Sequence, residues 1–204
     1  MPSRSDLART AMIRAAEEVA VERGLGATTL SEVQQRAGQA NKSAARYHFG
    51  SRDGLLDAVL EARMKPVDAH RRQLLEASSG VRLDHGEVAA LFVRPLAAQT
   101  LGRPGSRFAR FLMQALSDPT QSARVLEHVR AASFRELRDR FRATTPLPAE
   151  LAELRFGSLV MLTVATLATW EGHRDDSIDV DLVVDDLVNI ATAVLDTPPT
   201  GGTR

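Results

Sequence analysis

The chain has 204 residues, of which 44% are hydrophobic and 25% charged, and its formal net charge at pH 7 is zero. This length and hydrophobic content allow one substantial core plus a small appended domain. The absence of cysteine excludes disulfide bonds and thiolate metal sites, and the N-terminus lacks the pattern of a signal peptide. We therefore expect a soluble, cytoplasmic protein with no membrane partner.

Apolar residues recur at helical spacing along nearly the whole chain, and no segment has the alternating pattern of a strand. The sequence thus predicts an all-α fold of about nine helices. Pro66 is expected to kink the fourth of them. The predicted helices are Leu7–Arg23, Leu30–Gly38, Asn41–Phe49, Ser51–Ser78, Glu87–Leu101, Ser106–Leu116, Thr120–Arg142, Ala149–Trp170 and Val180–Leu195.

The segment from Thr28 to Gly54 has the pattern of two short helices around a tight turn. Thr29 is a good N-cap and Glu32 follows three residues later, so this pair predicts a capping box and a helix that begins near Leu30. Gly38 tolerates the left-handed conformation that ends a helix and turns the chain. Two helices joined by such a turn are typical of a helix-turn-helix DNA-binding domain.

The second short helix is expected to start at Asn41, a good N-cap, and to divide into two faces at about 100° per residue. Because so short a helix is not stable alone, its packing face must hold it while its polar face points outward. That arrangement presents a basic surface to the major groove. The polar face comprises Lys42, Ser43, Arg46 and Tyr47, and the packing face comprises Ala44, Ala45, His48 and Phe49.

These residues resemble the DNA-binding domain of the TetR (tetracycline-repressor-like) transcriptional regulators. The resemblance is carried by the Thr-Thr helix start, by Ala37-Gly38 with the polar turn after it, and by YHFGSRDGLL at 47–56. It covers roughly the first sixty-five residues. Compared with the commoner family pattern, one extra residue lies between Gly38 and Phe49, and the sequence also departs from that pattern at Gln34, Gln39 and Ala40.

The resemblance implies an N-terminal three-helix helix-turn-helix domain followed by a C-terminal helical domain for ligand binding and dimerisation. We expect the helix-turn-helix domain at 1–53, a connecting helix at 54–80, the ligand-binding and dimerisation domain at 81–198 and a flexible tail at 199–204. The implied function is that of a repressor that binds double-stranded, near-palindromic operator DNA as a homodimer. An unknown, partly apolar small molecule would act as its effector.

DNA contacts are expected from Thr29, Gln39, Asn41, Lys42, Ser43, Arg46, Tyr47 and His48. Lys42, Ser43 and Arg46 are assigned to base edges or nearby phosphates, and Thr29 and Tyr47 to the DNA backbone. His48 either donates to a phosphate or satisfies a backbone group at the helix end. The charge distribution agrees with this site, because residues 1–50 hold seven Lys or Arg against five Asp or Glu.

The last two predicted helices have wide apolar surfaces, which favour pairing with the same helices of a second copy. The alternative is that they are the innermost helices of a monomer. The residues expected in the dimer interface are Leu159, Leu162, Leu167, Val183, Leu187 and Val194.

Large or adaptable apolar side chains with one amide are the candidates for an effector pocket. A buried core gives the same pattern, so the two readings stay open. The candidate residues are Phe92, Phe111, Met113, Gln114 and Trp170.

Other classes of function have little support in the sequence. No GxSxG motif, phosphate-binding glycine loop or paired carboxylates indicate an enzyme, and the histidines lack the spacing of metal ligands. We therefore expect no catalytic activity, cofactor or metal. The apolar run Phe156–Trp170 is too short to span a bilayer, which favours a buried helix. The alternatives are a DNA-binding regulator controlled by a protein partner instead of a small molecule, or an all-helical enzyme.

Overall fold

The computed structural model describes residues 3–41, 43–129, 131–173 and 179–199. Within these ranges it has ten α-helices, one short 3-10 helix and no strand, which confirms the all-α prediction. Lys42 and all of the expected tail except Pro199 lie outside the described residues. The elements are α1 (Arg4–Arg23), η1 (Leu25–Ala27), α2 (Leu30–Arg36), α3 (Ala44–Phe49), α4 (Arg52–Ala77), α5 (His85–Gln99), α6 (Phe108–Ser117), α7 (Ser122–Val129), α8 (Ala132–Thr144), α9 (Ala149–Gly172) and α10 (Val180–Asp196).

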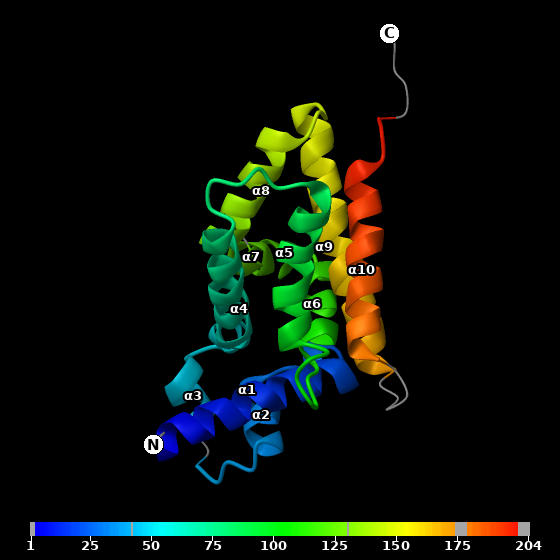
Figure 1. Cartoon of the computed structure of the whole chain (residues 1–204). Helices are drawn as coiled ribbons and strands as arrows, with labels where there is room; N and C mark the ends of the chain where they lie inside the picture. The colour runs from blue at the N-terminus through cyan, green and yellow to red at the C-terminus, as the bar shows by residue number, and fades with distance from the viewer. Residues whose placement is uncertain (1–2, 42, 130, 174–178, 200–204) are drawn as a thin grey trace.

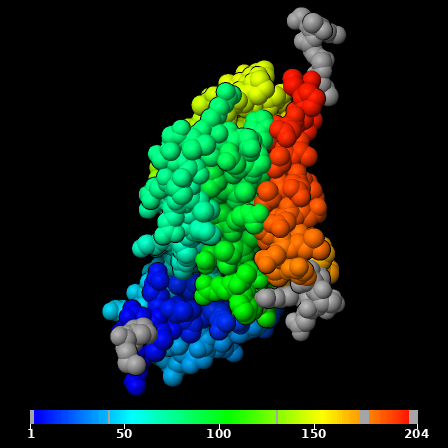
Figure 2. All heavy atoms as spheres, viewed as in Figure 1, coloured from blue at the N-terminus to red at the C-terminus, as the bar shows by residue number. Residues whose placement is uncertain are grey.

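The helices form a base and an upright bundle. Figure 1 shows α1, α2 and α3 in the base, α4 rising from it, and α5 to α10 above, with α9 and α10 side by side at one edge. In the space-filling view the lower end of the bundle rests directly on α1 (Figure 2). The base is thus attached to the bundle both through the chain, by α4, and through contacts.

Only one of the two hydrogen bonds of the predicted capping box forms at the start of α2. The hydroxyl of Thr29 accepts a hydrogen bond from the backbone N–H of Glu32 at 3.2 Å, and α2 begins at Leu30. The Glu32 carboxylate instead accepts from Arg23 Nη1 at 2.5 Å, so the reciprocal half of the expected capping box is not formed. An ion pair to α1 therefore replaces the local contact that the motif predicts.

The second short helix begins later than predicted, at Ala44 instead of Asn41. The side chain of Asn41 accepts from the N–H of Ser43 at 3.0 Å, and its carbonyl accepts from the N–H of Ala44, also at 3.0 Å. Asn41 thus stabilises the turn before α3 and does not cap the helix itself. An Asn side chain competes for backbone donors in both settings, so sequence alone does not separate them.

Burial agrees with the two predicted faces of α3, except that His48 is only half-buried and Lys42 lies outside the described residues. Ala44, Ala45 and Phe49 are buried, whereas Arg46 and Tyr47 are exposed. The base fixes this short helix from two sides: Gln34 of α2 accepts from the N–H of Ala45 at 3.2 Å, and the guanidinium of Arg9 lies 5.7 Å from the Phe49 ring centroid. Tertiary contacts therefore supply the stability that six residues of helix cannot supply alone.

Gly54 allows α3 and α4 to approach closely. A Cβ atom built on Gly54 would lie 2.1 Å from the carbonyl oxygen of Phe49, which belongs to the backbone and cannot rotate away. We expect Gly54→Ala to lower the free energy of unfolding by about 1–3 kcal/mol, as overpacking does. Urea denaturation followed by circular dichroism measures this loss. Gly26→Ala is the control, because a Cβ there meets nothing within 4 Å, and an equal loss in both variants would contradict the argument.

A buried ion pair joins α1 to α4. Arg63 donates from Nε and Nη2 to the two carboxylate oxygens of Glu17, at 2.5 and 2.8 Å. Glu17 is 2% and Arg63 7% exposed, so each charge depends on the other for solvation. This bidentate contact fixes the lower half of α4 to the base.

A second buried arginine joins the upper half of α4 to α5. Pro95 lies inside α5 and has no N–H, which leaves the carbonyl of Leu91 without its helical partner. The Nε of Arg71 donates to this carbonyl at 3.1 Å, and its guanidinium lies 5.2 Å from the Phe92 ring centroid. Burial lowers the pKa of Arg71 to about 10, so the side chain remains charged at neutral pH.

Pro66 lies in α4 between these two arginines and does not end the helix, which continues to Ala77. Because Pro66 has no N–H, the carbonyl of Ala62 lacks its partner along the helix. The backbone of α4 therefore lacks one helical hydrogen bond at this point.

The single helix predicted at Thr120–Arg142 is wrong, since the structure has α7 and α8 in its place. Ala131 is extended, with φ −57° and ψ 171°, and the chain turns there without a glycine or proline. Asp68 of α4 accepts from the N–H of Ser133 at 3.0 Å and so caps α8 from another helix. Such a cap is not visible in the local sequence.

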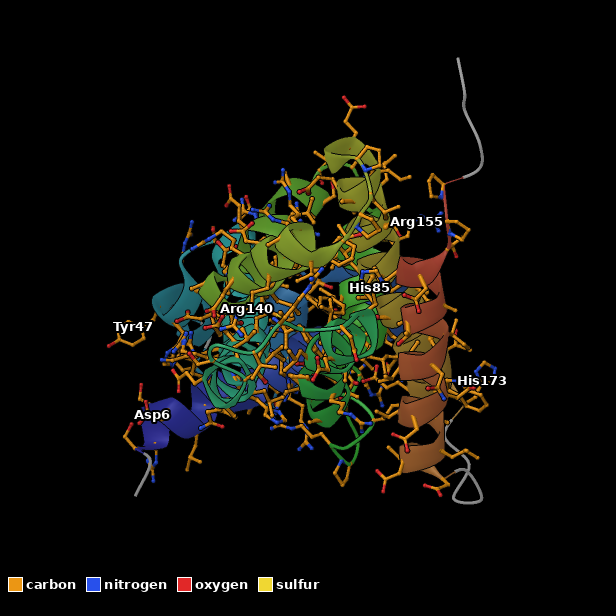
Figure 3. The ribbon with its side chains drawn as sticks, turned by 45° about the horizontal axis from the view of Figure 1, so that its top comes forward. Asp6, Tyr47, His85, Arg140, Arg155 and His173 are labelled. Atoms are coloured by element: carbon orange, nitrogen blue, oxygen red, sulfur yellow. The ribbon has the colours of Figure 1, made fainter. Side chains whose placement is uncertain are left out.

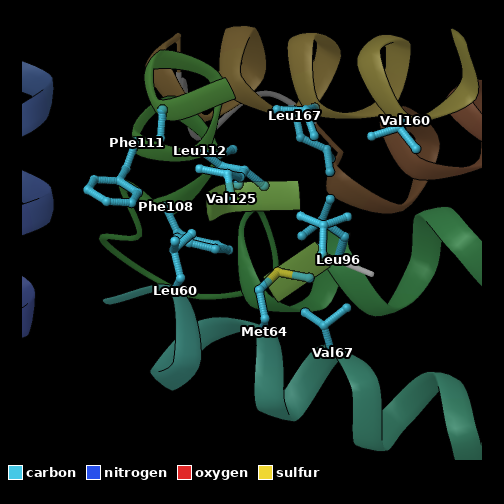
Figure 4. Packing of buried hydrophobic residues seen from close by; sticks show 14 of the residues in the cluster. Leu60, Met64, Val67, Leu96, Phe108, Phe111, Leu112, Val125, Val160 and Leu167 are labelled. Carbon is cyan, nitrogen blue, oxygen red and sulfur yellow. The ribbon is translucent and has the colours of Figure 1, made fainter. Parts of the chain in front are cut away.

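The bundle core is formed by α4, α5, α6 and α9. Figure 4 shows Leu60, Met64 and Val67 of α4 facing apolar side chains of the neighbouring helices. α9 is long and apolar enough to cross a membrane by length and composition alone, so the expectation that its apolar run is too short is wrong. In the structure α9 packs against α6 and α10.

Candidate nucleic-acid interface

A surface groove of about 680 Å³ lies between α2 and α3. It contains two of the predicted DNA-contacting residues, Gln39 and Arg46. Ser31 and Gln35 of α2 were not predicted, although both are exposed and stand one helical turn apart on its outer face. The complete lining, here called the reading groove, is Leu30, Ser31, Gln34, Gln35, Gln39, Ala40, Ala45 and Arg46.

Arg46 and Tyr47 are the most prominent polar groups of α3. Arg46 is exposed and forms no ion pair with any residue that the structure describes. Tyr47 is 82% exposed, and Figure 3 shows it projecting away from the body of the protein. Both side chains are thus free to contact a ligand that approaches the outer face of α3.

The other predicted residues differ in how far they are engaged within the protein. Thr29 and Asn41 are exposed, but their side-chain oxygens already accept backbone hydrogen bonds, and Ser43 is exposed just before α3. His48 is half-buried, with its ring centroid 5.1 Å from that of Tyr47 and 6.0 Å from that of Phe49. The His48 ring therefore lies edge-on to the tyrosine ring.

The acidic residues of the base are largely occupied by arginines. Glu22 accepts from Arg36 at 2.7 Å and from Arg107, next to α6, at 2.8 Å. These two bonds lower the pKa of Glu22 from 4.5 to about 2. Because the pKa is depressed in the folded chain, this link stabilises the fold above about pH 4.5 and is lost as the pH falls toward 2.

The five candidate pocket residues are not brought together around one site. Phe92 and Phe111 are 2% and 0% exposed, and the Phe92 ring packs against Phe134 and Phe156 at 6.0 and 6.1 Å. Met113 and Gln114 are half-buried on α6. Trp170 is 36% exposed and lines a surface groove between α9 and α10. The five residues predicted from the sequence therefore include both core and surface positions.

The dimer candidates are likewise divided between interior and surface. Leu159, Leu167 and Leu187 are at most 1% exposed within the single chain, because they pack into its own core. Leu162, Val183 and Val194 are half-buried. Five of the eight large exposed hydrophobic residues in the described chain lie on α9 and α10. These five, here called the outer apolar face, are Leu154, Met161, Trp170, Leu182 and Ile190.

The fold and the site are those of a helix-turn-helix DNA-binding regulator, in which the short helix α3 is held outward in the base, below the helical bundle (Figure 1). Residues 12–59 match the model of the family described as bacterial regulatory proteins, tetR family. The match covers the helix-turn-helix part of the chain and agrees with the resemblance to this family of regulatory proteins.

Solved structures share the fold over nearly the whole chain. The TetR-family transcriptional regulator PfmR from Thermus thermophilus is 16% identical, with a TM-score of 0.60 and coverage of 98% of this chain and 100% of that one. The fatty acid degradation regulator FadR from Bacillus halodurans is also 16% identical, with a TM-score of 0.61 and coverage of 90% and 97%. A TetR/AcrR-family transcriptional regulator from Thermobifida fusca is 18% identical, with a TM-score of 0.51 and coverage of 92% and 96%. None of the curated proteins matches the chain.

Proposed function

We propose that this protein is a transcriptional repressor that binds a near-palindromic operator as a homodimer in the cytoplasm and is released by a small molecule. The observation that carries the proposal is the outer face of α3, where Arg46 and Tyr47 are exposed while Ala44, Ala45 and Phe49 are packed against the base. A helix held in this way inserts into the major groove as a rigid unit.

Within this proposal, Arg46 reads a guanine and the polar side chains around it fix the helix on the DNA. Arg46 lines the reading groove together with Gln35 and Gln39, which offer amides to base edges or phosphates. Tyr47 and His48 contact the phosphate backbone at the outer end of α3. Thr29, Asn41 and Ser43 contribute from the starts of the two helices, and so does Lys42, which lies outside the described residues.

The homodimer forms, in this proposal, through the outer apolar face. Leu182 and Ile190 are 67% and 45% exposed, and together with Trp170 they line a groove of about 510 Å³ between α9 and α10. An apolar surface of this kind on the last two helices favours a four-helix contact with a second copy. Leu162, Val183 and Val194, which are half-buried, are placed at its margin.

The effector, partly apolar, acts in the bundle at residues 81–198, as the resemblance to the TetR regulators implies. A small molecule with unequal affinity for two arrangements of the base shifts the protein toward one of them. Control by a protein partner is the second candidate, and it is supported by the packed aromatic cluster around Phe92, which fills part of the bundle.

The assignment of α3 is tested with Arg46→Gln. We expect this variant to bind a selected operator about tenfold to 100-fold more weakly and to lose preference at one base pair in each half-site, since a bidentate contact to guanine contributes about 1–3 kcal/mol. The operator is first recovered by selecting genomic DNA fragments on the purified protein, and affinities are measured by fluorescence anisotropy. Arg142→Gln, an exposed position on α8, is the matched control. Unchanged affinity and base preference in the Arg46 variant would exclude this reading face.

A further inference from the structure

A cleft of about 510 Å³ lies where the base meets the bundle. One wall is the outer side of α1, a second is α4 near Arg63, and the third is the turn between α5 and α6. We call it the arginine cleft. Its lining residues are Leu7, Arg9, Thr10, Ala11, Ile13, Arg14, Ala62, Arg63, Arg103, Pro104, Gly105 and Ser106.

The charge of this lining is entirely positive. Four arginines line the cleft and none of the lining residues is acidic. Arg14 is exposed and forms no ion pair with the residues that the structure describes. Arg63 is held by Glu17 through Nε and Nη2, so its carboxylate partner lies behind the cleft wall in the interior.

The arginines also lie close enough to affect one another. Partial burial lowers the pKa of Arg103, and the positive charges of Arg63 and Arg14 lower it further, more than Glu17 restores it. Guanidinium groups held together in a concave site attract an anion, because its charge relieves their repulsion. Each group can also donate two parallel hydrogen bonds to a phosphate or carboxylate.

We propose that the arginine cleft binds a small phosphorylated organic molecule. The volume lies within the range of about 300–1,000 Å³ that is usual for small-molecule sites. The arginines would hold the phosphate groups, while Ala11, Ala62 and Pro104 offer apolar surface to the rest of the ligand. Arginine is suited to both parts, because its planar group binds phosphate at its edge and stacks on flat rings with its face.

Such a ligand would act on DNA binding, an extension that rests on the proposed function. The cleft is bounded by α1, which is part of the base, and by the turn between α5 and α6, which is part of the bundle. A molecule that binds both walls stabilises one orientation of the base relative to the bundle. By linkage, its affinity then depends on whether operator DNA is bound.

The test uses the full-length protein and sodium tripolyphosphate in isothermal titration calorimetry at constant ionic strength. We expect a dissociation constant below about 1 mM for the unmodified protein. Arg14→Gln and Arg103→Gln should each weaken binding about tenfold or more, because each removes a charge-assisted hydrogen bond. Both positions are exposed, so circular dichroism should show that the variants fold normally.

Two controls locate the bound anion. Arg46→Gln, in the reading groove, should bind tripolyphosphate as the unmodified protein does, and equal weakening there would place the anion on the DNA-binding face and overturn the proposal. Absence of binding, or full binding by the Arg14→Gln/Arg103→Gln double variant, would also overturn it. Citrate binding as tightly as tripolyphosphate would overturn the assignment of phosphate and leave a carboxylate site. Because none of these titrations contains DNA, they hold whether or not the operator proposal succeeds.

Discussion

Leu182→Glu combined with Ile190→Glu should convert the proposed homodimer to a monomer and weaken binding to the proposed operator by about 100-fold or more. Both side chains lie on the outer apolar face and are 67% and 45% exposed in the single chain, so the changes leave its own core intact. In a dimer, however, each change buries an unpaired charge. A monomer can occupy only one half-site at a time and loses the gain of linked binding. Analytical ultracentrifugation gives the assembly state, and fluorescence anisotropy gives the operator affinity.

Val81→Glu is the matched control for this experiment. Val81 is 58% exposed in the segment between α4 and α5, and therefore offers a comparable apolar side chain outside α9 and α10. This variant should remain dimeric and bind the operator normally. A Leu182→Glu/Ile190→Glu protein that still sediments as a dimer would move the interface to another surface.

Glu17→Leu should lower the free energy of unfolding by about 3–5 kcal/mol, because it leaves the buried charge of Arg63 without its partner. The contact is bidentate and both residues are almost inaccessible, so water cannot replace the lost carboxylate. Urea denaturation monitored by circular dichroism measures the change. A loss of this size is a large part of the stability of a typical domain.

The double variant Glu17→Leu/Arg63→Met separates the value of the pair from the cost of an unpaired charge. Replacing both partners with apolar side chains of similar size is often neutral or stabilising. We therefore expect the double variant to recover most of the stability lost in Glu17→Leu. If it is as unstable as the single variant, the pair itself, and not desolvation of the orphaned guanidinium, contributes the stability.

Much of the fold could be predicted because most helices are specified locally. The periodicity of apolar residues gives α5, α6, α9 and α10 within two residues at each end. The errors occur where a partner distant in the sequence decides the conformation. Asp68 of α4 caps α8 where the sequence predicts one continuous helix, and Arg23 of α1 binds the Glu32 carboxylate that is expected to complete the capping box of α2. Neither contact has a local pattern.

In the candidate interface, too, some residues could be predicted from the local sequence and others depend on how the helices pack. The exposed and buried faces of α3 follow from angular spacing, so Arg46 and Tyr47 could be assigned from the sequence. Ser31 and Gln35 belong to the other wall of the reading groove, and their role depends on how α2 and α3 pack. On α9 and α10 periodicity identifies apolar positions but does not tell which arc faces the core. Leu187, at 1% exposure, and Ile190, at 45%, therefore could not be distinguished.

The proline within α4 determines where that helix can bend. Below it, Arg63 fastens the helix to α1, and above it, Arg71 fastens the helix to α5. Breaking either arginine contact would leave a buried charge without a partner. Each half of α4 is therefore held in place by its own contact. The missing hydrogen bond at Pro66 lies between them, and proline is a common site of helix bending. α4 therefore consists of two segments joined at Pro66, one attached to the base that carries α3 and the other attached to the bundle.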